Sequence, residues 1–223
     1  MSPRRDPPSS ASTKLADPKR FDPADYTVVT VHKEAKGLVL GGDPEDFIRY
    51  FKASLHPYDP DAEEEPEQRE VVATVRFSHV AFGAWGGNGR SIKFDFADAV
   101  SGELLEIADA LFDDEHGDTR EELDVSGAGA DLLHIEMIEV TPGYETFEVV
   151  RYLLAHILER YGHGCMGAVY YQADWESIGV ARPLKERCFR QLRTKNRQVW
   201  FVDLGRVQPP LDEKATESPT SEE

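Results

Sequence analysis

The stretch that decides the fold is LLHIEMIEVTPGYETFEVVRYLLAHILERYG, residues 132–162. Its first part, 132–140, is the most apolar strand-like run of the chain. After a turn at 141–144, apolar residues recur every three or four positions from about 145 to 161, which predicts an amphipathic helix ending at Gly162. The apolar run MGAVYYQA at 166–173 predicts another strand. This strand–helix–strand order predicts two parallel strands joined by a crossover helix.

Shorter patterns predict the other elements. Further strands are expected at 26–32, 70–85, 91–97 and 199–204. Further helices are expected at 43–55, 101–112 and 182–192. Runs 70–85 and 91–97 would form a hairpin through the turn GGNGR. The order β-α-β-β-α-β-α-β-α-β indicates an α/β (α+β) fold, a mixed sheet with helices on its faces.

The two ends of the chain differ from its middle in composition. Residues 1–24 are rich in Pro, Ser and charged residues and show no apolar period, so they are expected to form a disordered arm. The same reasoning predicts a disordered acidic tail at 207–223. The folded domain is therefore expected at 25–206.

Acidic residues dominate the charge, with 42 Asp and Glu against 25 Lys and Arg and a formal net charge of −17. Such a charge repels nucleic acids and anionic membranes, so neither is expected as a partner. The two cysteines form no disulfide framework, and no apolar run approaches the roughly 18 residues that span a bilayer. A cytoplasmic protein with reduced thiols is the expectation.

The turn at 140–144 carries a resemblance to a known family. Val140, Pro142 and Tyr144 match a Val-x-Pro-x-Tyr turn, and the strand before it and the helix after it have the same character as in the GNAT (GCN5-related N-acetyltransferase) superfamily. The resemblance implies a GNAT-like mixed, mostly antiparallel central sheet with helices on both faces. It also implies acetyl-CoA as cofactor and transfer of the acyl group to an amine of a small molecule or protein.

The resemblance further implies where the cofactor would lie, along the strand and over the first turn of the helix. The corresponding positions are Ile138, Val140, Glu145, Thr146, Phe147, Glu148, Val149 and Val150. Here the sequence departs from the family. Glu145 stands where Arg or Gln is usual, the loop has no glycine, and Phe189 replaces a tyrosine that protonates the leaving thiolate. The alternative is therefore a catalytically degenerate member that serves as a ligand-binding or protein-interaction module, and a homodimer remains open for either.

Two carboxylates on the strand at 132–140 are the candidate catalytic residues. Glu136 or Glu139 could act as general base toward an amine. The alternative is that both face solvent or pair with a cation. His134 leaves the same choice between a base and a structural residue. His156, His163 and Cys165 have no closed zinc spacing, so no metal is expected.

One concentrated basic segment stands out, RPLKERCFRQLRTKNR at 182–197, with seven basic residues against one acidic residue. It could bind a phosphate or an anionic partner. Alternatively, it is a solvated helix face that pairs with the acidic residues of the same chain.

Overall fold

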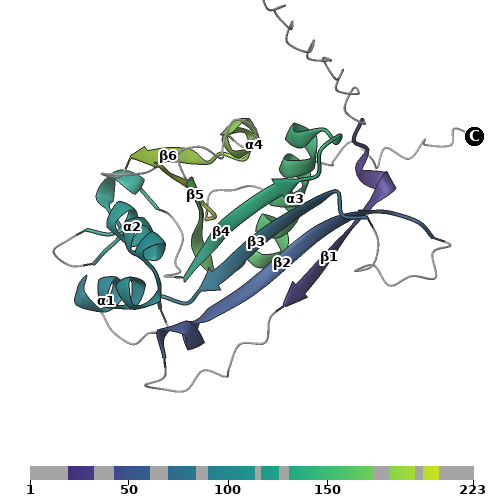
Figure 1. Cartoon of the computed structure of the whole chain (residues 1–223). Helices are drawn as coiled ribbons and strands as arrows, with labels where there is room; N and C mark the ends of the chain where they lie inside the picture. Colours follow the sequence, from purple (N-terminus) through teal and green to yellow (C-terminus); the bar gives the residue numbers. More distant parts are fainter. Residues whose placement is uncertain are drawn as a thin grey trace, which may run out of the picture.

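The computed structural model describes residues 20–32, 43–60, 70–83, 90–113, 117–125, 131–172, 181–193 and 198–205. Seven strands in these ranges form one sheet in the order β1-β2-β3-β4-β5-β7-β6 (Figure 1). The strands are β1 (Tyr26–His32), β2 (Ile48–Pro57), β3 (Ala73–Val80), β4 (Asp131–Val140), β5 (Cys165–Gln172), β6 (Arg190–Arg193) and β7 (Gln198–Asp203). The α-helices are α1 (Arg90–Val100), α2 (Gly102–Leu111), α3 (Thr146–Tyr161) and α4 (Ala181–Glu186). Short 3₁₀ turns occupy Pro23–Asp25, Pro44–Phe47 and Glu121–Leu123.

The central prediction, a strand–helix–strand unit, is confirmed. β4 and β5 pair in parallel, and α3 connects them and ends at Gly162. Every other neighbouring pair of strands in the sheet is antiparallel. The fold is therefore a mixed, mostly antiparallel α/β sheet with helices on both faces, as the sequence predicts.

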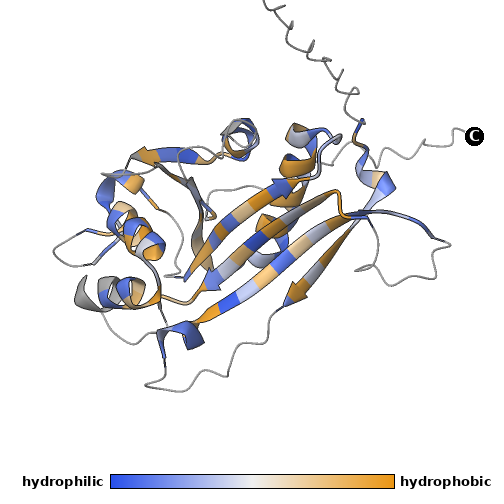
Figure 2. Ribbon diagram, in the orientation of Figure 1, coloured by the Kyte–Doolittle hydropathy of each residue, from blue (hydrophilic) through white to orange (hydrophobic). Residues whose placement is uncertain are grey.

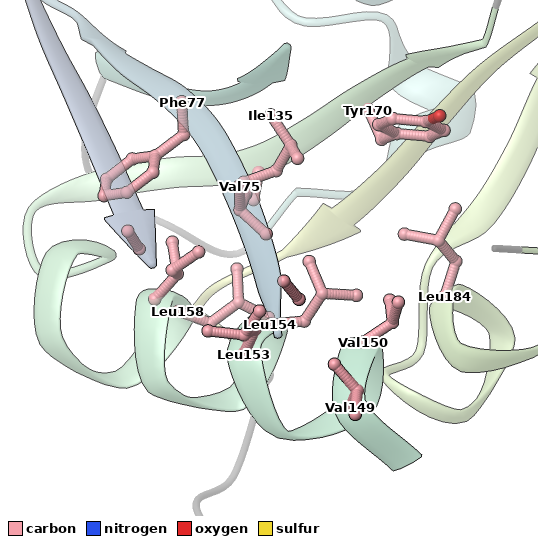
Figure 3. Close-up of a cluster of buried hydrophobic side chains, with 14 of the residues drawn as sticks. Val75, Phe77, Ile135, Val149, Val150, Leu153, Leu154, Leu158, Tyr170 and Leu184 are labelled. Atoms are coloured by element: carbon pink, nitrogen blue, oxygen red, sulfur yellow. The ribbon is translucent and has the colours of Figure 1, made fainter. Parts of the chain in front are cut away.

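Helix α3 covers one face of the sheet, running behind β2, β3 and β4 in the view of Figure 1. Its buried residues come in adjacent pairs that recur about once per helical turn, and such a pattern forms one apolar stripe toward the core. They are Val149, Val150, Leu153, Leu154, Ile157 and Leu158. Figure 3 shows Leu153, Leu154 and Leu158 among them on the side of α3 that faces the strands of Val75, Phe77 and Ile135.

A second cluster fills one end of the opposite face, under α1 and α2. Ser101 begins α2 as predicted, because its hydroxyl accepts a hydrogen bond from the Leu104 amide at 3.1 Å. Leu104, Ile107 and Leu111 of α2 pack with residues of β4, β5 and β7. The rest of this face, over β1, β2 and β3, carries no helix in the described part of the chain (Figure 1).

The predicted helix at 43–55 is wrong. Asp43 caps a single 3₁₀ turn by accepting from the Glu45 amide at 3.2 Å, and the chain then extends as β2. The spacing of Ile48, Phe51 and Leu55 fits a helical stripe, but FKASLH at 51–56 also alternates between apolar and polar residues. Pairing with β1 on one side and β3 on the other satisfies the backbone of this alternating run and decides the outcome.

The predicted hairpin through 91–97 is also wrong, because residues 90–100 form α1. Phe96 and Ala97 are both fully buried, whereas Asp95 and Asp98 are exposed. Two adjacent buried residues followed by a polar one are a helical pattern, not a strand pattern. The predicted strand at 70–85 is confirmed only as β3, and the turn GGNGR falls mostly outside the described residues.

The predicted basic helix at 182–192 is shorter than expected. Helix α4 ends at Glu186, and Cys188 adopts a left-handed backbone conformation with φ of 64°. The chain then continues as β6, which pairs with β7. The basic side chains consequently lie on a helix, a turn and a strand.

The folded region begins before the boundary expected at residue 25. Phe21 is buried in the main core and stacks on Tyr26, with 4.9 Å between ring centroids. It also lies 5.5 Å from the ring of Tyr152 on α3. Residues 1–19 of the predicted arm and the whole predicted tail, 207–223, lie outside the described residues. No helix in the described ranges is long and apolar enough to cross a membrane.

The close contact between β5 and β7 requires glycine at position 167. A Cβ atom there would lie 2.6 Å from Cζ of Phe201 and 2.7 Å from the carbonyl oxygen of Val202. Neither group can move freely, because both belong to the paired strand β7. We expect Gly167→Ala to lower the free energy of unfolding by about 1–3 kcal/mol, measured by urea denaturation. Gly102→Ala is the matched control, since nothing lies within 4 Å of its Cβ position. Equal losses in the two variants would contradict this packing.

The two cysteines are both free and should react very differently. Burial, followed by the nearby charge of Asp131, raises the pKa of the Cys165 thiol to about 12. Cys188 is exposed. Because the thiolate is the reactive form, a chromogenic disulfide reagent at pH 8 should modify Cys188 in the folded protein and Cys165 only after denaturation. Release of two equivalents from the native protein at one rate would contradict this expectation.

Candidate functional site

The parallel strands β4 and β5 separate partway along their length. Their pairing runs to Ile135, opposite Tyr170, whereas β4 continues to Val140 and β5 to Gln172. Beyond the last pair, β5 stays joined to β7. The backbone of β4 at 136–140 therefore has no β5 partner on that side. Unpaired strand backbone of this kind can bind an extended ligand through its N–H and C=O groups.

A bulge in β4 lies at the same level as this separation. Arg76 and Phe77 are adjacent on β3, but they pair with Met137 and Ile135, so Glu136 is the extra residue on β4. Bulges redirect side chains, and they are common beside functional sites. Here the carboxylate of Glu136 lies on the face opposite α3, close to Tyr50. Burial, then the charges of Glu136 and Glu45, raises the pKa of the Tyr50 hydroxyl.

Glu136 lines a groove on the face that α1 and α2 leave uncovered. The groove has a volume of about 640 Å³, within the range of small-molecule sites. Its walls come from β1, β2, β3 and β4. The lining residues are Val29, Val31, Tyr50, Phe51, Lys52, Ser54, His56, Val71, Arg76 and Glu136.

The N-terminus of α3 lies just beyond the end of β4. Glu145 precedes the helix, and its side chain makes no capping hydrogen bond. The amide of Val149 bonds to the carbonyl of Glu145 at 3.3 Å, so the amides of Thr146, Phe147 and Glu148 precede that first bond. Amides in this position, with the positive end of the helix dipole, favour an anion.

Basic side chains lie around this helix end, and one of them neutralises the carboxylate of Glu148. The Glu148 carboxylate accepts from Nε of Arg151 at 2.8 Å and pairs with a second nitrogen of the same guanidinium at 2.8 Å. Arg187 donates to the backbone carbonyl of Arg151 at 3.3 Å. Arg182 stacks on the ring of Phe147, 4.2 Å from its centroid. Burial, then the neighbouring Arg151, lowers the pKa of Arg187, as expected where cations gather.

The structure separates the predicted site residues into two groups. The side chains of Ile138, Val140, Val149 and Val150 pack into the main core, and the last two are completely buried. The side chains of Val149 and Val150 therefore cannot contact a ligand, whereas Ile138 and Val140 are only partly buried. Glu145, Thr146, Phe147 and Glu148 are at least partly accessible at the start of α3.

The two candidate bases also differ in position. Glu136 lines the groove at the level where β4 and β5 separate. Glu139 is exposed further along β4, opposite Thr74, and does not line the groove. The geometry therefore favours Glu136 as the group that could take a proton from a bound amine.

Other polar residues singled out in the sequence have structural partners. His134 is 7% exposed, and its Nε2 lies 3.0 Å from the carboxylate of Glu103 on α2, which fits the structural interpretation. His156 on α3 has a pKa lowered by burial and then by Arg160. The described ranges contain no group of three His, Cys, Asp or Glu side chains arranged to hold a metal ion.

The basic segment contributes to packing as well as charge. Arg190 donates to the carbonyl of Leu123 and lies 5.7 Å from the ring centroid of Phe201. Lys185 lies 5.9 Å from that of Trp200. Arg182 is paired with Glu186 one turn along α4, at 3.6 Å. Among the described residues of this segment, Arg182 and Arg187 contact α3. They are therefore the ones placed to bind an anion at the N-terminus of that helix.

Tyr50, Lys52 and Arg76 are among the groove residues that the sequence does not identify. Tyr50 and Lys52 fall in the helix predicted at 43–55, and Arg76 falls in the strand predicted at 70–85. The alternation of polar and apolar residues at 51–56 was the available signal for β2. Figure 2 shows such alternation along β2 and β3. The register that places Lys52 opposite Arg76 has no local signature in the sequence.

Comparisons with known proteins give one distant likeness. No protein-family model matches the chain, and no curated protein matches it. Among solved structures, the chain is similar to Arabidopsis thaliana NAA60 in complex with a bisubstrate analogue, at 12% identity and a TM-score of 0.34. The likeness covers 72% of this chain and 75% of the other. At this level of similarity, the activity of the chain has to be argued from its own residues.

Proposed function

We propose that this chain is a GNAT-fold acyltransferase that binds an acyl-CoA between β4 and β5 and transfers the acyl group to an amine. The observation that carries the proposal is the occurrence of three features along the second half of β4 and just beyond its end. They are the separation of β4 from β5, the bulge at Glu136 and the nearby N-terminus of α3. Together they supply a backbone edge for an extended chain, a carboxylate and an anion-binding helix end.

The pantetheine arm would lie along the free edge of β4 at 136–140, bonded to its backbone. The pyrophosphate would lie at the amides of Thr146, Phe147 and Glu148. Glu148 alone would repel it, but Arg151 neutralises that carboxylate at 2.8 Å. Arg182 and Arg187 add further positive charge beside this helix turn.

The chemistry requires a proton acceptor and a leaving group. Glu136 would accept a proton from the ammonium form of the acceptor, so that the free amine nitrogen can attack the thioester carbonyl. The carbon–nitrogen bond forms, the carbon–sulfur bond breaks, CoA leaves as a thiolate, and the attacking nitrogen loses its second proton to solvent as the amide forms. Phe189 is buried and has no hydroxyl, so the thiolate would take its proton from solvent. We therefore expect slow turnover.

The second candidate function is binding of an acyl-CoA or CoA without transfer. One observation favours it, the absence of a hydroxyl at Phe189. In that case the same strand edge and helix end would hold the ligand. Binding with no release of CoA in the presence of amines would distinguish this candidate from the first.

Isothermal titration calorimetry with acetyl-CoA tests the proposal. We expect binding to the wild-type chain, and a roughly two- to fivefold tighter Kd for Glu148→Gln, because Arg151 is then free to meet the pyrophosphate. Arg160→Gln is the control, since it removes a charge at the opposite end of α3. Absence of heat and of any thermal shift at millimolar acetyl-CoA would exclude the proposal. Weaker binding by Glu148→Gln would show that the pyrophosphate does not bind at the N-terminus of α3.

A further inference from the structure

Two basic side chains, those of Lys52 and Arg76, line the groove on the sheet face opposite α3. Lys52 and Arg76 are directly opposite each other on the antiparallel strands β2 and β3. Both side chains are exposed and both line the groove. Like charges opposite each other in a sheet destabilise it, so the pair needs a compensating anion or a functional reason.

No carboxylate of the described residues forms an ion pair with Lys52 or Arg76. The guanidinium of Arg76 instead donates to the thioether sulfur of Met137 at 3.0 Å, which is a weak acceptor. Two cationic groups thus face the groove with their strong hydrogen-bonding capacity available.

Glu136 lies beside this cation pair. Arg76 pairs with Met137, the next residue after the bulged Glu136, so the carboxylate is one strand away from the guanidinium. Because neighbouring strands are about 4.8 Å apart, the Glu136 carboxylate and the cationic groups of Lys52 and Arg76 are separated by roughly 5–10 Å across the groove. A ligand that satisfies both would carry a positive and a negative group a few bonds apart.

The overall charge of the protein does not oppose such a ligand. A molecule with one ammonium and one carboxylate is neutral, so the net charge of −17 neither attracts nor repels it strongly. At physiological ionic strength, charges further than about 8 Å are largely screened. The local pair in the groove therefore decides the orientation of the ligand.

We propose that the acceptor is a primary amine that also carries a carboxylate, with Lys52 and Arg76 holding the carboxylate and Glu136 facing the amine. This inference rests on the proposed function, and it names the class of acceptor for the same site. The shared chemistry fits a free amino acid or the N-terminus of a peptide that begins with an acidic residue. The groove volume of about 640 Å³ admits either.

Acyl transfer from acetyl-CoA to matched amines tests the inference on the full chain. The small-molecule arm compares glycine with glycinamide, and the peptide arm compares Glu-Gly-Gly-amide with Gln-Gly-Gly-amide. In the arm that represents the true source, we expect kcat/KM to be at least about tenfold higher for the carboxylate-bearing amine. Equal rates within both pairs would overturn the inference and leave the acyltransferase proposal standing.

Charge variants separate the groove from the cofactor site. Lys52→Gln and Arg76→Gln should each remove most of the preference for the carboxylate by raising KM, with the Kd for acetyl-CoA unchanged. Arg49→Gln is the control, because it removes an exposed charge from the same strand outside the groove lining. If Lys52→Gln and Arg76→Gln leave the preference intact, the inference is wrong.

Direct binding of the same amines by calorimetry covers the case in which no transfer occurs. The carboxylate-bearing member of one pair should bind the wild-type chain at least about tenfold more tightly than its amide, and both groove variants should abolish the difference. This result without acetyl-CoA binding would keep the groove assignment and reject the acyltransferase. Equal binding of acid and amide would reject the groove assignment.

Discussion

Glu136→Gln should lower kcat for acyl transfer by roughly two to four orders of magnitude, the range typical of general-base removal. The amide keeps the shape of the side chain but cannot accept the proton. The Kd for acetyl-CoA should stay within about twofold, since the cofactor would meet the backbone of β4 and not this carboxylate. Steady-state release of CoA with a reactive amine gives kcat, and calorimetry gives the Kd.

Glu139→Gln is the matched control for that experiment. Glu139 is on the same strand and is also a carboxylate, but it is exposed and lies outside the groove lining. We expect it to leave kcat unchanged. If Glu136→Gln kept the wild-type kcat, or if Glu139→Gln lowered kcat by as much as Glu136→Gln, Glu136 would not be the general base.

Phe77→Ala should cost about 3–5 kcal/mol of unfolding free energy, a large part of the stability of an ordinary domain. Phe77 is completely buried and stacks on Phe51 at 5.0 Å between centroids, with the planes 9° apart. Its ring also lies 5.1 Å from that of Tyr161 at the end of α3. The substitution would open a cavity between the sheet and the helix.

The same residue ties the core to the candidate site. Phe77 follows Arg76 at the register shift opposite the Glu136 bulge, so its ring anchors the strand segment that sets the bulge. Urea denaturation measures the loss, and Phe77→Leu serves as a control that should cost clearly less. A loss below about 1 kcal/mol for Phe77→Ala would contradict the burial and the register described for β3.

The part of the fold that could be predicted is the part whose hydrophobic period is unambiguous. The strand at 131–140 is an apolar run that ends at a turn, and α3 repeats its apolar positions over four turns. The order of this strand, α3 and the apolar run at 166–173 then predicts parallel pairing through a crossover. Ser101 and Gly162 marked helix ends because capping is a local property.

The failures come from runs whose pattern fits two periods. Residues 48–55 fit both a helical stripe and an alternating strand, and the pairing with β1 and β3 decided for the strand. Residues 91–97 alternate like a strand, and the burial of Phe96 together with Ala97 shows the helix that tertiary packing selects. Local sequence carries no information about which neighbours will be present.

The candidate site was predictable only for residues that lie close together in the sequence. Glu136 and the start of α3 are close in sequence to the turn that the resemblance identified. Lys52 and Arg76 come from separate strands, and their opposition depends on the register of β2 and β3. The neutralisation of Glu148 by Arg151 was a local signal, since the two are three residues apart on one helix.

The most direct test of the account is amide hydrogen exchange with and without acetyl-CoA. We expect the cofactor to slow exchange in two segments, the β4 edge at 137–140 and the first turn of α3 at 146–148. Exchange in the pair β1 and β2 should not change. Protection confined to other segments, or no protection at millimolar acetyl-CoA, would contradict the claim that the separation of β4 and β5 is a cofactor site.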